Sequence, residues 1–340
     1  MSFKEKTLED FFQLLLPEID NQIKEEIERI SENYSQLKYM LRYHMGWEEN
    51  EGARPQGKRI RPLLLLLSVI GSGEEWKCGL SAAAAVELVH NFSLIHDDIE
   101  DKSEYRRGRK TLWVKWGIPQ AINAGDLMFS LAQNAIANDK KSLENSKTIE
   151  LLKLLQKTCI KLTQGQHLDL LFESEELITV DQYLNMISGK TAALLSCSTE
   201  MGAIIAGANE EKRRHLKEFG FSLGMAFQVV DDILGVWGEE DVIGKSVDGD
   251  IAQKKKTLPI LYALQSSRDM QKLWRQNVLD QNAINELRNQ MEKIGAKKHT
   301  EKIAKSFSDT AMKSINLAIT DNSMRDALLS LTNQLLSRVN

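Results

Sequence analysis

The chain has 340 residues, of which 42% are hydrophobic and 27% are charged, and its formal net charge at pH 7 is −4. These values are typical of a globular protein that can bury a large core, as one large helical domain or as two ordinary ones. Because the net charge is slightly negative and no arm or stripe of basic residues occurs, nucleic acid is not expected as a partner.

Helices are expected along almost the whole chain. Apolar residues recur at spacings of three and four, β-branched alternation is absent, and the five prolines fall outside the long periodic segments. Two segments, Leu80–Leu94 and Thr191–Ala206, are apolar all round and should be buried centrally. The sequence therefore predicts an all-α, single-domain bundle over residues 1–340 with about 12–13 helices. They are expected near 18–44, 60–71, 77–104, 119–138, 146–173, 179–188, 190–207, 210–237, 257–267, 269–276, 281–294, 297–318 and 322–338.

The cysteines and the first residues of the chain indicate the cellular compartment in which the protein is expected. Cys78, Cys159 and Cys197 are odd in number and lie in apolar helical context, which favours core packing in a reducing compartment over disulfides or a zinc site. The first residues lack the apolar stretch of a signal peptide, and no apolar run approaches the roughly 18 residues of a membrane span. We therefore expect a cytoplasmic protein without a transmembrane segment.

The first chemical motif is an acidic cluster, His96–Asp101, at the end of an apolar run. Asp97 and Asp101 are four residues apart, so both carboxylates should lie on one helix face within about 6 Å. Like charges at that spacing repel, and a hard divalent cation removes the penalty. The alternative is a helix end that carries solvated acids, which the helix dipole disfavours. Arg106 and Arg107 follow closely, which indicates a site for Mg²⁺ together with a phosphate group.

A second acidic pair, Asp231 and Asp232, follows Gln228 on one helix face. An Asp-Asp pair alone is weak evidence and is more often surface charge. Lys245 lies in the connection Gly238–Gln253, which is about 16 residues long, and loops of that length are usually functional. The run Lys254–Lys256 follows this connection. Ammonium groups neutralise phosphate as point charges, which strengthens the prediction of a second wall of the same site.

Two further segments offer cations at expected helix starts. Gly57–Pro62 contains Lys58 and Arg61, and Gly189 precedes Lys190 and Thr191. Anions bind at helix N-termini, although solvated surface charge is the alternative for each. His90 lies about two turns before the first acidic cluster and is either a core histidine or a donor to a diphosphate. The sequence contains no Walker A motif, so P-loop chemistry is not expected.

In these motifs the chain resembles the trans-isoprenyl diphosphate synthases, or polyprenyl synthetases, and most of all the geranylgeranyl diphosphate synthases. The matches run in order over nearly the whole length: Gly57–Pro62, Leu94–Asp101, Arg106–Gly108, Gly125-Asp126, Gly165-Gln166, Gly189–Thr191, Phe227–Leu234, Gly244-Lys245 and Lys255. The resemblance implies helices around a deep central cavity, a homodimer and a prenyltransferase that condenses isopentenyl diphosphate with dimethylallyl, geranyl or farnesyl diphosphate.

The resemblance also assigns the site residues. It implies a cluster of Mg²⁺ ions, about three per active site, bound by Asp97, Asp101 and Asp231. Isopentenyl diphosphate would be bound by Lys58, Arg61, His90 and Arg107. The allylic diphosphate would be bound by Arg106, Lys190, Thr191, Gln228, Lys245 and Lys255. The residues implied to act in the ionisation step are Asp97, Asp98, Asp101, Arg106, Lys190, Asp231 and Lys245.

One position departs from the family pattern. The second motif usually reads Asp-Asp-x-x-Asp, and Gly235 occupies its last position here. A ligand is lost at that point, and the nearby acids Glu239, Glu240 and Asp241 are candidates to compensate. We still expect activity, because Asp231 and Asp232 remain.

Product length and two rival functions remain open. In the family, the residues four and five before the first Asp line the tunnel for the prenyl tail, and here they are Ser93 and Phe92. Phe92 should lie about 7.5 Å down the helix from Asp97. A single ring there, and a first motif without the insertion of bacterial farnesyl diphosphate synthases, favour geranylgeranyl diphosphate. The alternative is that Phe92 is core and that Met128 or Phe129 ends the tunnel. The rivals are a class I terpene cyclase and a non-catalytic partner subunit.

Overall fold

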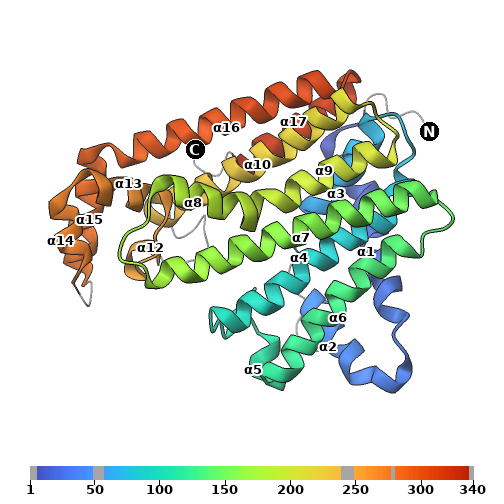
Figure 1. Ribbon diagram of the computed structural model, residues 1–340, viewed down its shortest axis with the longest axis horizontal. Helices are drawn as coiled ribbons and strands as arrows, with labels where there is room; N and C mark the ends of the chain where they lie inside the picture. The colour runs from blue at the N-terminus through green and yellow to red at the C-terminus, as the bar shows by residue number, and fades with distance from the viewer. Residues whose placement is uncertain (1–5, 49–56, 239–248, 277–279, 337–340) are drawn as a thin grey trace. The chain divides into compact units, whose positions relative to one another are not determined.

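The computed structural model describes residues 6–48, 57–238, 249–276 and 280–336. Within these ranges the chain is helical almost throughout, which confirms the all-α prediction (Figure 1). The helices are α1 (Leu8–Glu28), α2 (Ser35–Met45), α3 (Ile60–Gly71), α4 (Leu80–Glu100), α5 (Leu112–Trp116), α6 (Ile118–Ala137), α7 (Asn145–Ser174), α8 (Val180–Ile187), α9 (Ala193–Ile205), α10 (Glu210–Trp237), α12 (Gly249–Ala252), α13 (Leu258–Ser266), α14 (Arg268–Trp274), α15 (Gln281–Ile294), α16 (Ala296–Ala318) and α17 (Asn322–Leu336). Short 3-10 turns span Glu32–Tyr34 and Trp76–Gly79, and strands β1 (Tyr105–Arg106) and β2 (Arg109–Lys110) form a hairpin.

The first helices differ from the prediction. The helix expected over 18–44 is two helices, and α1 starts at Leu8, where Thr7 and Asp10 form a capping box. The prediction that the prolines fall outside the long periodic segments was wrong for Pro17, which lies inside α1. The missing N–H costs one helix hydrogen bond. Burial of one face offsets that cost, because Phe11, Leu15, Ile19 and Ile23 are fully buried.

The structure divides into two compact units, which are described separately. Unit 1 comprises residues 1–157, 197–213 and 321–324, and unit 2 comprises 158–196, 214–320 and 325–340. In unit 1, α4 packs along α6 and against α1 and α3. In unit 2, α13 packs against α14, α15 and α16. The single catalytic domain expected over residues 1–340 stays a prediction.

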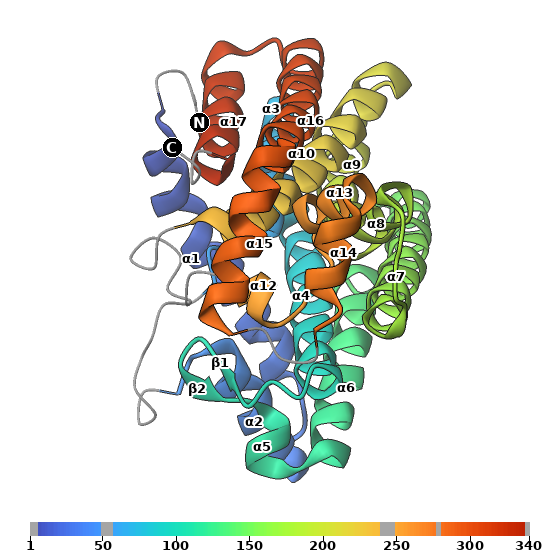
Figure 2. The same ribbon diagram turned by 90° about the vertical axis from the view of Figure 1, so that its left-hand side faces the viewer.

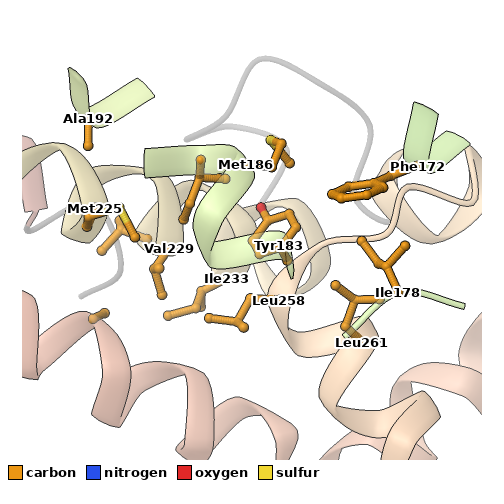
Figure 3. Packing of buried hydrophobic residues seen from close by; sticks show 13 residues of the cluster. Phe172, Ile178, Tyr183, Met186, Ala192, Met225, Val229, Ile233, Leu258 and Leu261 are labelled. Carbon is orange, nitrogen blue, oxygen red and sulfur yellow. The ribbon is translucent and has the colours of Figure 1, made fainter. Parts of the chain in front are cut away.

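The apolar segments are buried as expected. Ala82–Val86 in α4 is completely buried, and α9 is buried along its whole length. In unit 2, Tyr183, Val229 and Leu258 bring α8, α10 and α13 into one apolar cluster (Figure 3). Two helical stretches, Trp76–Glu100 and Glu210–Trp237, are long and apolar enough to span a membrane. Their most apolar windows are 67% and 72% buried inside the protein, as is usual for core helices.

Candidate active site

In unit 1, the first acidic cluster lies at the C-terminal end of α4. Asp98 is 2% exposed and accepts a hydrogen bond of 2.8 Å from Arg106 Nε. Burial raises the pKa of Asp98 above its usual value, although Arg106 opposes the shift. Asp97 is partly exposed, and Asp101 is exposed at the C-cap of α4. Asp98 therefore holds Arg106 in place, while Asp97 and Asp101 are the accessible pair.

The β1–β2 hairpin positions the two arginines that follow (Figure 2). Arg107 and Gly108 form its two-residue turn with φ angles of 52° and 74°. Two consecutive left-handed residues fit a type I′ turn, whose twist matches the paired strands. The side chain of Arg106 in β1 thus contacts Asp98, and Arg107 lies at the tip of the hairpin.

The hairpin tip meets the Gly57–Pro62 segment. A Cβ atom at Gly57 would lie 2.6 Å from Arg107 Nη2, so a side chain at this position would require the guanidinium to shift. Burial lowers the pKa of His90 well below its usual value, and the charges of Arg61 and Arg107 lower it further. Three of the four residues that the resemblance assigned to isopentenyl diphosphate therefore lie close together.

This cationic cluster is suited to an anion. Burial lowers the pKa of the Arg61 guanidinium, and its buried Nε has no hydrogen-bond partner among the described residues. Burial also lowers the pKa of Arg107, and Arg59 contributes by repulsion. The fourth assigned residue, Lys58, is exposed. Crowded cations and an unpaired buried donor are both stabilised when a polyanion binds.

Arg59 has a role that the sequence reasoning missed. Its guanidinium is buried and binds Glu87 of α4 at 2.8 Å and Asp20 of α1 at 2.9 Å. Burial alone would lower its pKa, but the two carboxylates raise it overall. Arg59 has φ 49° at the N-cap of α3, so the ion pairs hold an uncommon left-handed residue. It fixes the backbone from which Lys58 and Arg61 project.

The proposed chain-length residues lie on α4 near α6. Phe92 packs edge-on against Phe129 of α6 and against His96, with ring centroids 5.2 and 5.5 Å apart. The Ser93 hydroxyl donates to the carbonyl of His90 at 2.8 Å. A Cβ atom at Gly125 would lie 2.3 Å from His96 Nε2, which explains the glycine at this crossing. Phe92 and Phe129 thus form one aromatic pair.

In unit 2, Asp232 is buried at the centre of a hydrogen-bond network. Its Oδ2 accepts from the Tyr183 hydroxyl at 2.6 Å and from the Leu258 backbone N–H at 3.2 Å. Its Oδ1 accepts from Gln228 Nε2 at 3.2 Å. Burial raises the pKa of Asp232 to about 7, although the hydrogen bonds oppose the shift. Asp232 therefore holds α8, α10 and α13 together, whereas Asp231 is exposed.

The network also orients the side chain of Gln228, a candidate residue for binding the allylic substrate. Gln228 Nε2 donates to Asp232, so its Oε1 is left to accept from the Thr191 hydroxyl at 2.9 Å. The hydroxyl proton of Thr191 is thereby used, and its oxygen lone pairs remain as acceptors. Gln228 keeps one amide N–H that can donate to a bound anion.

Lys190 and Thr191 were expected to open a helix, and this prediction was wrong. They lie in a π-helical turn, Ser188–Ala192, which joins α8 directly to α9. A Cβ atom at Gly165 of α7 would lie 2.2 Å from the Lys190 backbone nitrogen, and one at Gly189 would lie 2.6 Å from the Lys161 carbonyl. These glycines allow backbone contact, and the Lys190 ammonium reaches Asp169 of α7. Such π turns often mark functional sites.

The remaining candidates are less well placed. Lys255 is exposed after α12, and Lys245 lies outside the described residues. Within the described ranges, no group of three or more His, Cys, Asp or Glu side chains is arranged to hold a metal ion. Mg²⁺ usually binds one or two protein carboxylates together with substrate phosphates, so the pair Asp97 and Asp101 still fits. That the two acidic motifs face one cavity stays a prediction.

Comparison with known families gives a match over most of the chain. The sequence model of the family described as polyprenyl synthetase matches residues 50–294. A short chain isoprenyl diphosphate synthase from Methanothermobacter thermautotrophicus is 37% identical over 287 residues, which are 83% of this chain and 86% of the relative. A geranylgeranyl diphosphate synthase from Mycobacterium tuberculosis is 40% identical over 68% of this chain and 66% of its own.

Other relatives carry a different product name. A (2E,6E)-farnesyl diphosphate synthase from Mycobacterium tuberculosis is 39% identical over 67% of this chain, and the match spans 63% of that relative's length. Among solved structures, a geranylgeranyl pyrophosphate synthetase from Pyrococcus horikoshii superposes with a TM-score of 0.86 and 32% identity. That superposition covers 96% of this chain and 98% of the other. The similar proteins thus share a fold but differ in the product they are named for.

Proposed function

Because the chain belongs to the polyprenyl synthetase family, we propose that it is a trans-prenyltransferase that condenses isopentenyl diphosphate with an allylic diphosphate. The observation that carries the proposal is the cluster of Arg61, His90 and Arg107 beside the Asp98–Arg106 pair. It combines a diphosphate site with the acidic helix end needed for a second, metal-bound diphosphate. The short chain synthase, geranylgeranyl and farnesyl relatives support the substrate class.

The proposed mechanism needs no protein nucleophile. Asp97, Asp101 and Asp231 would hold Mg²⁺, which supplies charge stabilisation to the leaving diphosphate. Arg106, fixed by Asp98, donates to the same diphosphate as its C–O bond breaks. Arg61, His90 and Arg107 hold isopentenyl diphosphate so that its double bond attacks the allylic cation. A proton then leaves the condensed product, and the released diphosphate accepts it.

The proposal extends to the surroundings of the enzyme. We expect a homodimer, because the family resemblance implies one, and a cytoplasmic location, because the cysteines favour a reducing compartment. Lys190, Thr191, Gln228, Lys245 and Lys255 would bind the allylic diphosphate. In this account Asp232 acts on the substrate through Gln228 rather than by direct contact, because its carboxylate is already held by three hydrogen bonds.

Arg61→Ala should separate the two substrate sites. Loss of one charge-assisted hydrogen bond costs about 1.5–3 kcal/mol, which is a rise of roughly 10- to 100-fold in the Michaelis constant for isopentenyl diphosphate. The constant for the allylic substrate should stay within about threefold. Steady-state kinetics with each substrate varied in turn measure both. Lys77→Ala removes an exposed cation before α4 and serves as the control. An equal rise for both substrates would show that the assignment is wrong.

Phe92→Ala should lengthen the product. We propose geranylgeranyl diphosphate as the main product, because Phe92 and Phe129 form one ring pair below the first acidic motif. Removal of the Phe92 ring opens space for at least one further isoprene unit. Chromatography of dephosphorylated products measures the change, with Phe129→Ala as the matched variant. An unchanged distribution for Phe92→Ala with longer products for Phe129→Ala would place the end of the tunnel on α6.

Two other functions make different predictions. A class I terpene cyclase would release diphosphate from the allylic substrate and form a hydrocarbon or alcohol without isopentenyl diphosphate. A non-catalytic partner subunit would turn over neither substrate alone. Incubating the pure protein with labelled isopentenyl diphosphate and each allylic diphosphate distinguishes the three functions. Only a synthase incorporates the label, a cyclase consumes the allylic diphosphate without incorporating it, and a partner subunit does neither.

A further inference from the structure

Gly235 removes a carboxylate from the second acidic motif. It lies four residues after Asp231 on α10, which is the spacing that places two side chains on one helix face about 5–6 Å apart. The first motif has this spacing between Asp97 and Asp101. The acids that the sequence offered as compensation, Glu239, Glu240 and Asp241, lie outside the described residues.

A carboxylate from another helix lies against this position. A Cβ atom built on Gly235 would be 2.0 Å from Asp250 Oδ2, 2.6 Å from its Cγ and 3.2 Å from its Oδ1. The carboxylate of Asp250 therefore lies in the space that a side chain at position 235 would enter. No side chain, aspartate included, fits there unless Asp250 moves.

Packing fixes Asp250 at this place. Its neighbour Ile251 is fully buried and belongs to one apolar cluster with Val236, the residue that follows Gly235. The short helix α12 is closed by a hydrogen bond of 2.8 Å from the Lys255 N–H to the Asp250 carbonyl. The position of the carboxylate thus follows from the contact of α12 with α10.

We propose that Asp250 supplies the third carboxylate of the second acidic motif and, with Asp231, binds Mg²⁺ that carries a diphosphate. In this account Gly235 leaves the space that the Asp250 carboxylate occupies, so the glycine permits a metal ligand from α12 instead of removing one. The inference rests on the proposed function, because that function places a metal-bound diphosphate at this motif. It also explains why a carboxylate at 235 itself is not needed.

Binding of inorganic diphosphate tests the proposal without turnover. Calorimetry measures the Mg²⁺ concentration at which diphosphate binding is half-maximal. Asp250→Asn keeps the shape and removes the charge, and it should raise this concentration roughly 10- to 100-fold. Asp309→Asn, which removes an exposed carboxylate from α16, should leave it unchanged. Circular dichroism and melting without metal check that each variant folds.

An exchange of the two positions sharpens the test. Gly235→Asp alone should raise the Mg²⁺ requirement, because its side chain displaces Asp250. Gly235→Asp combined with Asp250→Gly should return the requirement to within about threefold of the wild type, because the carboxylate is restored from α10. An unchanged requirement in Asp250→Asn, while Asp231→Asn raises it, overturns the inference.

Turnover of the wild type keeps the two proposals apart. Diphosphate binding that depends on Mg²⁺ and Asp250, but without prenyl product, would leave the inference standing and refute the proposed function. If the wild type forms prenyl product but Asp250→Asn leaves the Mg²⁺ requirement unchanged, the inference about Asp250 is refuted and the proposed function stands.

Discussion

Asp97→Ala should abolish turnover and leave the fold intact. Asp97 is accessible near the end of α4, whereas its neighbour Asp98 is buried against Arg106. Loss of a ligand to the metal that stabilises the leaving diphosphate should lower kcat by roughly 10³-fold or more. The melting temperature without metal should hold or rise, because repulsion between Asp97 and Asp101, and with the helix dipole, is relieved.

The measurement compares initial rates at saturating Mg²⁺ with melting curves in a chelator. Glu104→Ala removes an exposed carboxylate from the segment after α4 and is the control for charge. A rate near that of the wild type in Asp97→Ala would refute the metal-binding role of the first motif. A fall in melting temperature equal to that of a core variant would instead assign Asp97 to structure.

Arg59→Ala should cause the largest loss of stability. Its guanidinium is 2% exposed and pairs with Glu87, which is 3% exposed, so truncation leaves a buried carboxylate without its cation. Breaking a buried pair in this way typically costs about 3–5 kcal/mol. Urea unfolding measures the change in the free energy of unfolding. Arg42→Ala, which breaks a surface pair with Glu28, should cost at most about 1 kcal/mol.

Replacement of both partners refines this prediction. Arg59→Met with Glu87→Leu removes the two charges together and should recover most of the loss, because no buried charge remains unpaired. Binding of isopentenyl diphosphate should stay weak in the double variant, since Arg59 also fixes the backbone before Arg61. Arg59→Ala within about 0.5 kcal/mol of the wild type would show that the pair is not structural.

Sequence periodicity predicted the elements whose pattern is local. Helices over 60–71, 210–237 and 281–294 appear with the expected ends. The start of α1 was missed because the expected helix began only after Pro17, although Thr7 and Asp10 form a capping box at the true start. The π turn at Ser188–Ala192 has no periodic signature, so Lys190 was read as the start of a helix.

The candidate site was predictable only in its list of residues. Spacing placed Asp97 and Asp101 on one helix face, but it did not set Asp98 apart. Burial of Asp98 against Arg106 depends on a hairpin that the sequence reasoning did not foresee. Arg59 looked like its basic neighbours, and only tertiary packing gave it two carboxylate partners. Asp250 and Gly235 lie on different helices and are far apart in the sequence, so residue spacing within one helix could not predict their contact.

The most direct measurement for the central claim is the release of diphosphate from geranyl diphosphate in the presence of Mg²⁺, with and without isopentenyl diphosphate. The account predicts little release without isopentenyl diphosphate, and with it one diphosphate for each isoprene unit added to geranyl diphosphate. Equal release under both conditions, with no label from isopentenyl diphosphate in the product, would contradict the account.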